Sequence, residues 1–132
     1  MLDASLFIAS ISPGEARHPA ARALLAGFAQ DVPFVVPALF RVEVIAALSR
    51  RNESDAFIDL VDARLRGPRF LAVAIDGPLL DLAIGVARRA RLRGYDAVYA
   101  ALALARSQPL ATLDRELAER LAVHYPDLVV IG

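Results

Sequence analysis

The sequence predicts an α/β fold, in which a central parallel β-sheet is flanked by α-helices on both faces. Short apolar segments alternate with longer amphipathic segments along the chain, and strands that alternate with helices form parallel sheets covered on both sides. The chain has 132 residues, of which 57% are hydrophobic, and this length is typical of one domain. Since no repeat or linker interrupts the pattern, we expect residues 1–132 to form a single domain.

Four short apolar segments are predicted to be buried strands. They are rich in apolar and branched residues and are bounded by proline, aspartate or glycine, and they cover 34–37, 70–75, 109–113 and 128–131. Met1 and Leu2, directly before Asp3, are interpreted as the end of a further strand. The carboxyl ends of parallel strands meet at one edge of the sheet, where open α/β sheets bind their ligands.

Between these strands, apolar residues recur at helical spacing. In segment 79–92 the repeating positions are Leu79, Leu82, Ala83, Val86, Ala87 and Ala90. In segment 54–66 they are Phe57, Leu60, Val61 and Leu65. Segments 16–30, 38–51, 96–106 and 115–123 are also predicted helices, and the residues after Asp3 have a helical pattern.

The composition excludes several classes of protein. All 15 basic residues are arginine, which excludes Walker A phosphate loops, receiver domains and Schiff-base enzymes, because each of these depends on a lysine. The absence of cysteine excludes disulfides and cysteine-bound metals. A net charge of zero gives no overall attraction to nucleic acid. With no apolar run long enough for a membrane span and no signal-peptide pattern, we expect a cytoplasmic protein.

Four aspartates directly precede or open predicted helices: Asp3, Asp76, Asp96 and Asp114. Taken one at a time, each is most simply a helix N-cap, whose side chain accepts a hydrogen bond from an early backbone N–H. Asp76 fits this role best, because Pro78 follows just inside the helix. Asp3 and Asp114 also follow strands directly, so they are expected at the edge of the sheet that binds ligands.

Glu43 lies inside the predicted helix 38–51, where its neighbours on the helix surface are apolar: Leu39, Phe40, Ala46 and Ala47. A carboxylate in such surroundings is costly unless a positive group meets it. That group is either Arg50, in a buried ion pair, or a metal ion. Several converging carboxylates would repel one another, and Mg²⁺ or Mn²⁺ relieves this repulsion. His18 and His124 are expected in solvent and suggest no rival site.

Four motifs, taken together, resemble those of PIN-domain ribonucleases. They are "LDAS" (2–5), "VEVIAAL" (42–48), "LRGYDAVYAALA" (92–103) and "LATLD" (110–114). Their order and spacing match over nearly the whole chain, and at this length the chain looks most like the VapC-type toxins of type II toxin–antitoxin pairs. The resemblance implies a PIN fold and metal-dependent endonucleolytic cleavage of RNA, in which metal-activated water attacks the phosphodiester bond.

The resemblance also implies roles for particular residues. Asp3, Glu43, Asp96 and Asp114 match the acids that hold one or two Mg²⁺ or Mn²⁺ ions, and Ser5 and Thr112 match hydroxyls beside them. Asp76 matches no family acid, so it remains a predicted cap. The implied partners are an RNA substrate, a cognate antitoxin and a second copy of the chain in a homodimer. Only Met1 and Leu2 precede Asp3, so either the first strand is shorter than in the family or the natural start lies upstream.

Four arginines cluster just before Asp96: Arg88, Arg89, Arg91 and Arg93. They are either a solvated helix end, where positive charge is favoured by the helix dipole, or contacts to RNA phosphate. Arg50 and Arg51 are a second candidate for such contacts. Glu116 and Glu119 are expected to be solvated.

Two other functions are compatible with parts of this pattern. One is a binding module with the same fold and a weak or empty metal site, which would bind antitoxin or RNA without cleaving it. The other is a phosphatase of the haloacid dehalogenase type, which also places an aspartate after its first strand. That class needs a second aspartate two residues later, where this chain has Ser5, and a lysine, which this chain lacks.

Overall fold

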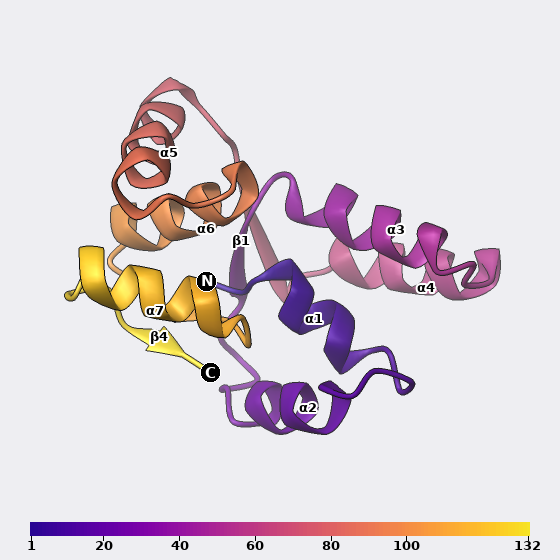
Figure 1. The fold of residues 1–132 in the computed structure, drawn as a ribbon. Coiled ribbons are helices and arrows are strands. Elements are labelled where there is room, and N and C mark those ends of the chain that lie inside the picture. The colour runs from indigo at the N-terminus through magenta and orange to yellow at the C-terminus, as the bar shows by residue number, and fades with distance from the viewer.

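The computed structural model describes residues 1–132, in which seven helices and four short strands alternate (Figure 1). The helices are α1 (Ala4–Ser10), α2 (His18–Ala26), α3 (Phe40–Arg50), α4 (Asp55–Leu65), α5 (Gly77–Ala90), α6 (Gly94–Ala105) and α7 (Arg115–His124). The strands are β1 (Phe34–Pro37), β2 (Phe70–Val73), β3 (Leu110–Ala111) and β4 (Val130–Ile131).

All strand pairing is parallel. β1 pairs with β2 over four residues, beginning with Phe34 opposite Phe70. β3 pairs with β4 over two residues, beginning with Leu110 opposite Val130. Each of these connections contains at least one helix, as parallel pairing requires.

The N-terminal residues join the two strand pairs. The Leu2 N–H donates to the carbonyl of Val35 in β1 at 3.2 Å, and the Asp3 N–H donates to the carbonyl of Ala111 in β3 at 3.1 Å. Leu2 also forms a parallel bridge with Ala111. The strand order is therefore β2, β1, the N-terminal segment, β3, β4. The short first strand predicted before Asp3 is present and lies at the centre.

Helices cover this sheet on both sides. In Figure 1, α5 and α6 lie on one side of β1, and α3 and α4 lie on the other. The middle of α6 is completely enclosed, with every residue from Ala97 to Ala103 buried. The predicted α/β class with a parallel sheet between helices is confirmed. No helix has both the length and the apolar character needed to cross a membrane.

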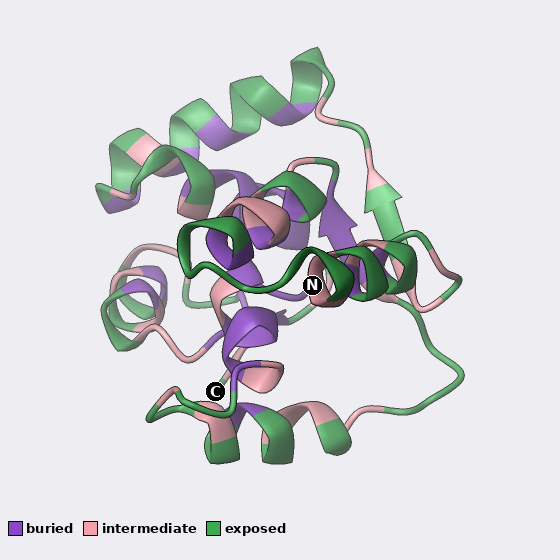
Figure 2. Ribbon diagram, turned by 90° about the vertical axis from the view of Figure 1, so that its right-hand side faces the viewer, coloured by how far each residue is buried: buried purple, intermediate pink, exposed green.

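The two strands on the β1 side differ in burial. Val35 and Val36 of β1 are buried, whereas Leu71 of β2 is 44% exposed (Figure 2). The prediction that 70–75 is a buried strand is therefore wrong, because β2 is the edge of the sheet. An edge strand has a neighbour on one side only, so apolar composition does not decide its burial.

Most predicted helix faces are buried, with two exceptions. Leu60 of α4 is 71% exposed and Leu82 of α5 is 39% exposed, although both fit the helical repeat. A helical repeat gives the spacing of apolar positions and does not say which of them a neighbouring element covers. The predicted segments 16–30, 109–113 and 128–131 are longer than the helix and strands that form there. Helix α5 begins at Gly77, because the side chain of Asp76 before it accepts a hydrogen bond from the Leu79 N–H at 2.9 Å.

Candidate active site

Asp3 is fixed at the carboxyl end of the central strand. Its carboxylate caps α1 by accepting from the Ser5 N–H at 3.3 Å and from the Ser5 hydroxyl at 2.6 Å. It also accepts from the Thr112 hydroxyl at 2.7 Å, and the residue is only 7% exposed. The predicted capping role of Asp3 is confirmed, and both hydroxyls, Ser5 and Thr112, lie directly beside it.

Asp114 is fixed in a similar way at the end of β3. Its side chain caps α7 by accepting from the Leu117 N–H at 3.0 Å. Its own N–H donates to the Thr112 hydroxyl oxygen at 3.1 Å. The Thr112 hydroxyl therefore connects Asp3 and Asp114, so the two strand ends are held in one arrangement. The capping prediction for Asp114 is confirmed.

Glu43 is half-buried on α3, and its carboxylate accepts a short hydrogen bond from the hydroxyl of Tyr99 on α6. Arg50 makes no ion pair with it, so the interpretation as a buried Glu43–Arg50 pair is wrong. Burial raises the pKa of Glu43, and the nearby charges of Asp3 and Asp96 raise it further, while the Tyr99 hydrogen bond acts in the opposite direction. Burial also raises the pKa of Tyr99, which keeps its donating proton.

Tyr99 is a site residue that the sequence reasoning missed. It follows Asp96 by three residues, and that spacing places two side chains on the same face of a helix. The signal was therefore present in the sequence. It was hidden because a tyrosine inside a long apolar segment is usually a core residue, and Tyr99 is indeed buried at its ring.

Asp96 lies in the first turn of α6 and is not its cap. The helix begins at Gly94, the N-cap is Arg93, and the Asp96 carboxylate makes no hydrogen bond. The prediction that Asp96 caps the helix is therefore wrong, because the helix starts before it. Burial raises the pKa of Asp96 to about 6, with further increases from Asp3 and Asp114, and the positive charge of Arg93 opposes this shift.

The four acids line one pocket of about 490 Å³ between α1, α3, α6 and the start of α7. None of them takes part in an ion pair, and the charges of neighbouring acids add to the raised pKa values of Glu43 and Asp96. No three carboxylates are arranged so that they hold one ion directly. The donor set nevertheless fits a hard divalent cation, because it consists of oxygen ligands with uncompensated negative charge.

The predicted arginines divide into two groups. Arg93 lines the acidic pocket, and Arg91 and Arg93 both line an adjoining polar cavity of about 220 Å³, which shares Asp96 and Asp114 with it. Arg88 and Arg89 are exposed and lie outside both cavities. The guanidinium of Arg89 lies 5.1 Å from the ring centre of Tyr125.

The other charged and histidine residues considered in the sequence differ in whether they line the acidic pocket. Arg50 lines the acidic pocket, whereas Arg51 pairs with Glu15 and is not at the site. Glu116 and Glu119 are exposed, as expected. His18 and His124 are half-buried, which corrects their assignment to solvent, and the ring of His18 hydrogen-bonds the carbonyl of Ala9 at 2.8 Å.

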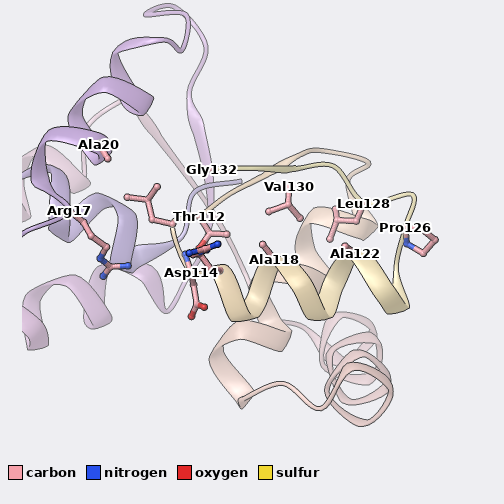
Figure 3. Close-up of a pocket in the computed structure, with 12 residues that line it drawn as sticks. Arg17, Ala20, Thr112, Asp114, Ala118, Ala122, Pro126, Leu128, Val130 and Gly132 are labelled. Atoms are coloured by element: carbon pink, nitrogen blue, oxygen red, sulfur yellow. The ribbon is translucent and has the colours of Figure 1, made fainter.

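A larger cavity, of about 690 Å³, is lined by only one of the four acids, Asp114 (Figure 3). Thr112 and Asp114 line one end of it, and Ala118, Ala122 and Val130 form an apolar wall. Asp3, Glu43 and Asp96 do not line it. Size therefore does not identify the site, whereas the convergence of carboxylates does.

Comparison with known proteins shows the family of this chain. A family model described as PIN domain matches residues 1–122. The chain belongs to the PIN-domain family. Among curated proteins, the PIN-domain chain is similar to Ribonuclease VapC3 of Mycobacterium tuberculosis strains CDC 1551 / Oshkosh and ATCC 25618 / H37Rv, with 35% identity over 100% of this chain and 91% of the relative.

Solved structures share the same fold. VapC20 of Mycobacterium tuberculosis, described as a sarcin–ricin loop cleaving toxin, superposes with a TM-score of 0.76 at 19% identity, covering 89% of this chain and 92% of that one. FitAcB from Neisseria gonorrhoeae gives 0.73 at 18% identity over 99% and 95% of the two chains. A toxin–antitoxin complex from Klebsiella pneumoniae gives 0.66 at 16% over 99% and 94%. The predicted PIN fold is confirmed.

Proposed function

We propose that this PIN-domain protein is a metal-dependent endoribonuclease and the toxin component of a toxin–antitoxin pair. The observation that carries the proposal is the convergence of Asp3, Glu43, Asp96 and Asp114 on one pocket without any neutralising ion pair. The full-length similarity to a protein named as a ribonuclease supports RNA as the substrate.

The four acids are the proposed ligands for Mg²⁺ or Mn²⁺. Each metal ligand of this kind needs an available oxygen, and Asp96 offers a carboxylate without a hydrogen bond. Asp114 and Glu43 each use one oxygen for a protein hydrogen bond and have the other available. When bound, such an ion lowers the pKa of a water molecule and stabilises negative charge on the phosphate.

The surrounding residues orient these ligands. Ser5 and Thr112 hold Asp3 with their hydroxyls, and Tyr99 holds Glu43 across the pocket. Ligands that are fixed by hydrogen bonds beyond the metal keep their geometry during the reaction. We assign the supporting role to these three hydroxyl groups.

Among the four clustered arginines, Arg93 and Arg91 are the proposed contacts to RNA phosphate. Arg93 lines the acidic pocket beside Asp96, and Arg91 lines the adjoining cavity. An RNA strand carries one negative charge per nucleotide, so arginines beside the acids offset the repulsion that the carboxylates would exert on it. Arg88 and Arg89 line neither cavity, so this contact is not assigned to them.

The proposed protein partners are a cognate antitoxin and a second copy of the chain. The antitoxin is supported by the similarity of this fold to a toxin–antitoxin complex. Homodimer formation remains a prediction from the family resemblance, and sedimentation of the purified protein tests it.

The deciding experiment is cleavage of RNA by the purified protein with Mg²⁺ or Mn²⁺, with EDTA, and with the Asp96→Asn variant. We expect cleavage only when both the metal and Asp96 are present. Asp76→Asn is the matched control, because it changes an aspartate outside the pocket and asparagine still caps a helix. Cleavage that survives both EDTA and Asp96→Asn would refute the proposal. A protein that neither cleaves RNA nor binds metal would instead be a binding module.

A further inference from the structure

Tyr95 is an exposed aromatic residue with no structural role in the fold. It lies in the first turn of α6 and lines the acidic pocket next to Asp96, and 64% of it is exposed. Its side chain makes no hydrogen bond, ring–ring contact or cation–π contact. By contrast, Tyr99 binds Glu43 and Tyr125 contacts Arg89.

The start of α3 and the residue before it supply apolar side chains to the pocket, in addition to Glu43 and Arg50. Val42 is 70% exposed, and Leu39 and Ala46 line the same pocket beside it. An exposed tyrosine and an exposed valine therefore border a pocket that also contains four carboxylates. A nucleobase is a flat, uncharged group that stacks on an aromatic ring, so the exposed Tyr95 ring beside apolar side chains offers it a binding surface.

The polar cavity that adjoins the acidic pocket contains arginines. The cavity that shares Asp96, Asp114 and Arg93 with the acidic pocket also contains Arg91 and Arg120. Arg120 is fixed there, because it donates to Glu116 at 2.7 Å and to the Arg91 carbonyl at 3.0 Å. Arg91 and Arg120 thus line the adjoining cavity, Arg93 lines both cavities, and Tyr95 and Val42 line the acidic pocket.

We propose that Tyr95 is the base-stacking residue of this ribonuclease: its ring stacks on an unpaired base next to the scissile phosphate, while the RNA backbone follows Arg93 and Arg91 into the adjoining cavity. The inference rests on the proposed function and adds to it the residue that contacts a base beside the scissile phosphate. A paired base is already stacked in its helix and is not available to the ring.

The expected effect follows from the strength of base stacking. Loss of an aromatic platform costs about 1–3 kcal/mol per base, which corresponds to roughly a 5- to 150-fold weaker affinity. Tyr95→Ala is therefore expected to raise Kd and KM for single-stranded RNA by this factor and to change kcat much less. Tyr95→Phe keeps the ring and is expected to restore affinity to within about two-fold.

The test measures binding separately from cleavage. Fluorescence anisotropy is recorded with a labelled single-stranded RNA of about 12 nucleotides, with Mg²⁺ present and in the Asp96→Asn background, so that the probe stays intact. A series of probes, each with one base removed, is titrated against the proteins with Tyr95 and with Tyr95→Ala. Leu60→Ala is the control, since Leu60 is an exposed apolar residue outside the pocket.

Stacking predicts one probe position at which removal of the base weakens binding to the protein with Tyr95 but not to Tyr95→Ala. The inference is overturned if Tyr95→Ala binds every probe as tightly as the protein with Tyr95. It is also overturned if Tyr95→Ala leaves RNA binding unchanged and instead weakens association with the antitoxin, because Tyr95 would then be a protein contact. If the unsubstituted protein cleaves RNA in either case, the proposed function stands and only the role of Tyr95 fails.

Discussion

Replacement of Asp96 by asparagine is expected to stabilise the metal-free protein at neutral pH. The pKa of Asp96 is about 6 in the folded chain, against an ordinary value of 3.8. At about 1.4 kcal/mol per pH unit, ionisation of this carboxylate costs the folded protein roughly 3 kcal/mol. Since the side chain is partly exposed, solvent screening reduces this to about 1–2 kcal/mol. Asparagine removes the charge, and no hydrogen bond is lost.

The raised pKa of Asp96 also predicts how the stability of the metal-free protein changes with pH. The folded protein keeps the Asp96 proton up to about pH 6, whereas the unfolded chain releases it near 3.8. The stability of the metal-free protein therefore falls as the pH rises between these values, and the cost persists at higher pH. Asp96→Asn is expected to raise Tm at neutral pH by about 3–10 °C and to have little effect at about pH 4 or below.

Thermal unfolding followed by circular dichroism in EDTA measures this difference. Asp76→Asn is the matched control, because its carboxylate caps α5 and asparagine retains that role with little change in Tm at either pH. Mg²⁺ or Mn²⁺ is expected to raise the Tm of the unsubstituted protein and not that of Asp96→Asn, since a ligand stabilises only the state that binds it. A lower Tm for Asp96→Asn at neutral pH in EDTA would show that the carboxylate stabilises the fold and would refute the reasoning.

Three further substitutions test the supporting residues. Tyr99→Phe removes the hydrogen-bond donor to Glu43, so we expect the free energy of unfolding at neutral pH to fall by about 1–2 kcal/mol. Calorimetry should also show weaker Mn²⁺ binding, and unchanged metal binding would contradict the orienting role of Tyr99. Thr112→Val removes two hydrogen bonds of a buried hydroxyl, and urea denaturation should show a loss of about 2–3 kcal/mol; a smaller loss than about 1 kcal/mol would mean that the hydroxyl links the strand ends only weakly. Arg93→Ala should raise KM for RNA. It should also remove about one phosphate contact, so that the slope of log affinity against log salt concentration becomes less steep by roughly 0.7. An equal effect of Arg88→Ala would instead indicate non-specific electrostatic attraction.

Much of the site is predictable because its acids belong to local patterns. Asp3 and Asp114 each follow a strand and precede a helix, and both cap as expected. A cap depends on backbone N–H groups within three residues of it, so the sequence contains all the information that the interaction needs. The order of the four motifs along the chain then indicates which acids belong to one site.

The exceptions have a common physical cause. Asp96 is also an aspartate after a glycine near a helix start, but α6 begins at Gly94 and leaves the carboxylate free. Helix starts are decided by packing as well as by local residues, and α6 is buried along most of its length. The exposure of Leu60 and Leu71 has the same origin, because a helical or strand pattern does not say where the neighbouring element ends.

The sequence by itself determined the alternation of strands and helices, the family, and the acids that end at one edge of the sheet. Only the tertiary structure decided the partners of those acids. Tyr99 reaches Glu43 across 56 positions in the chain, and Thr112 reaches Asp3 across 109. These contacts arise because the N-terminal segment lies between β1 and β3 and because α6 packs against the sheet, and neither arrangement is encoded within a few residues of the side chains that it brings together.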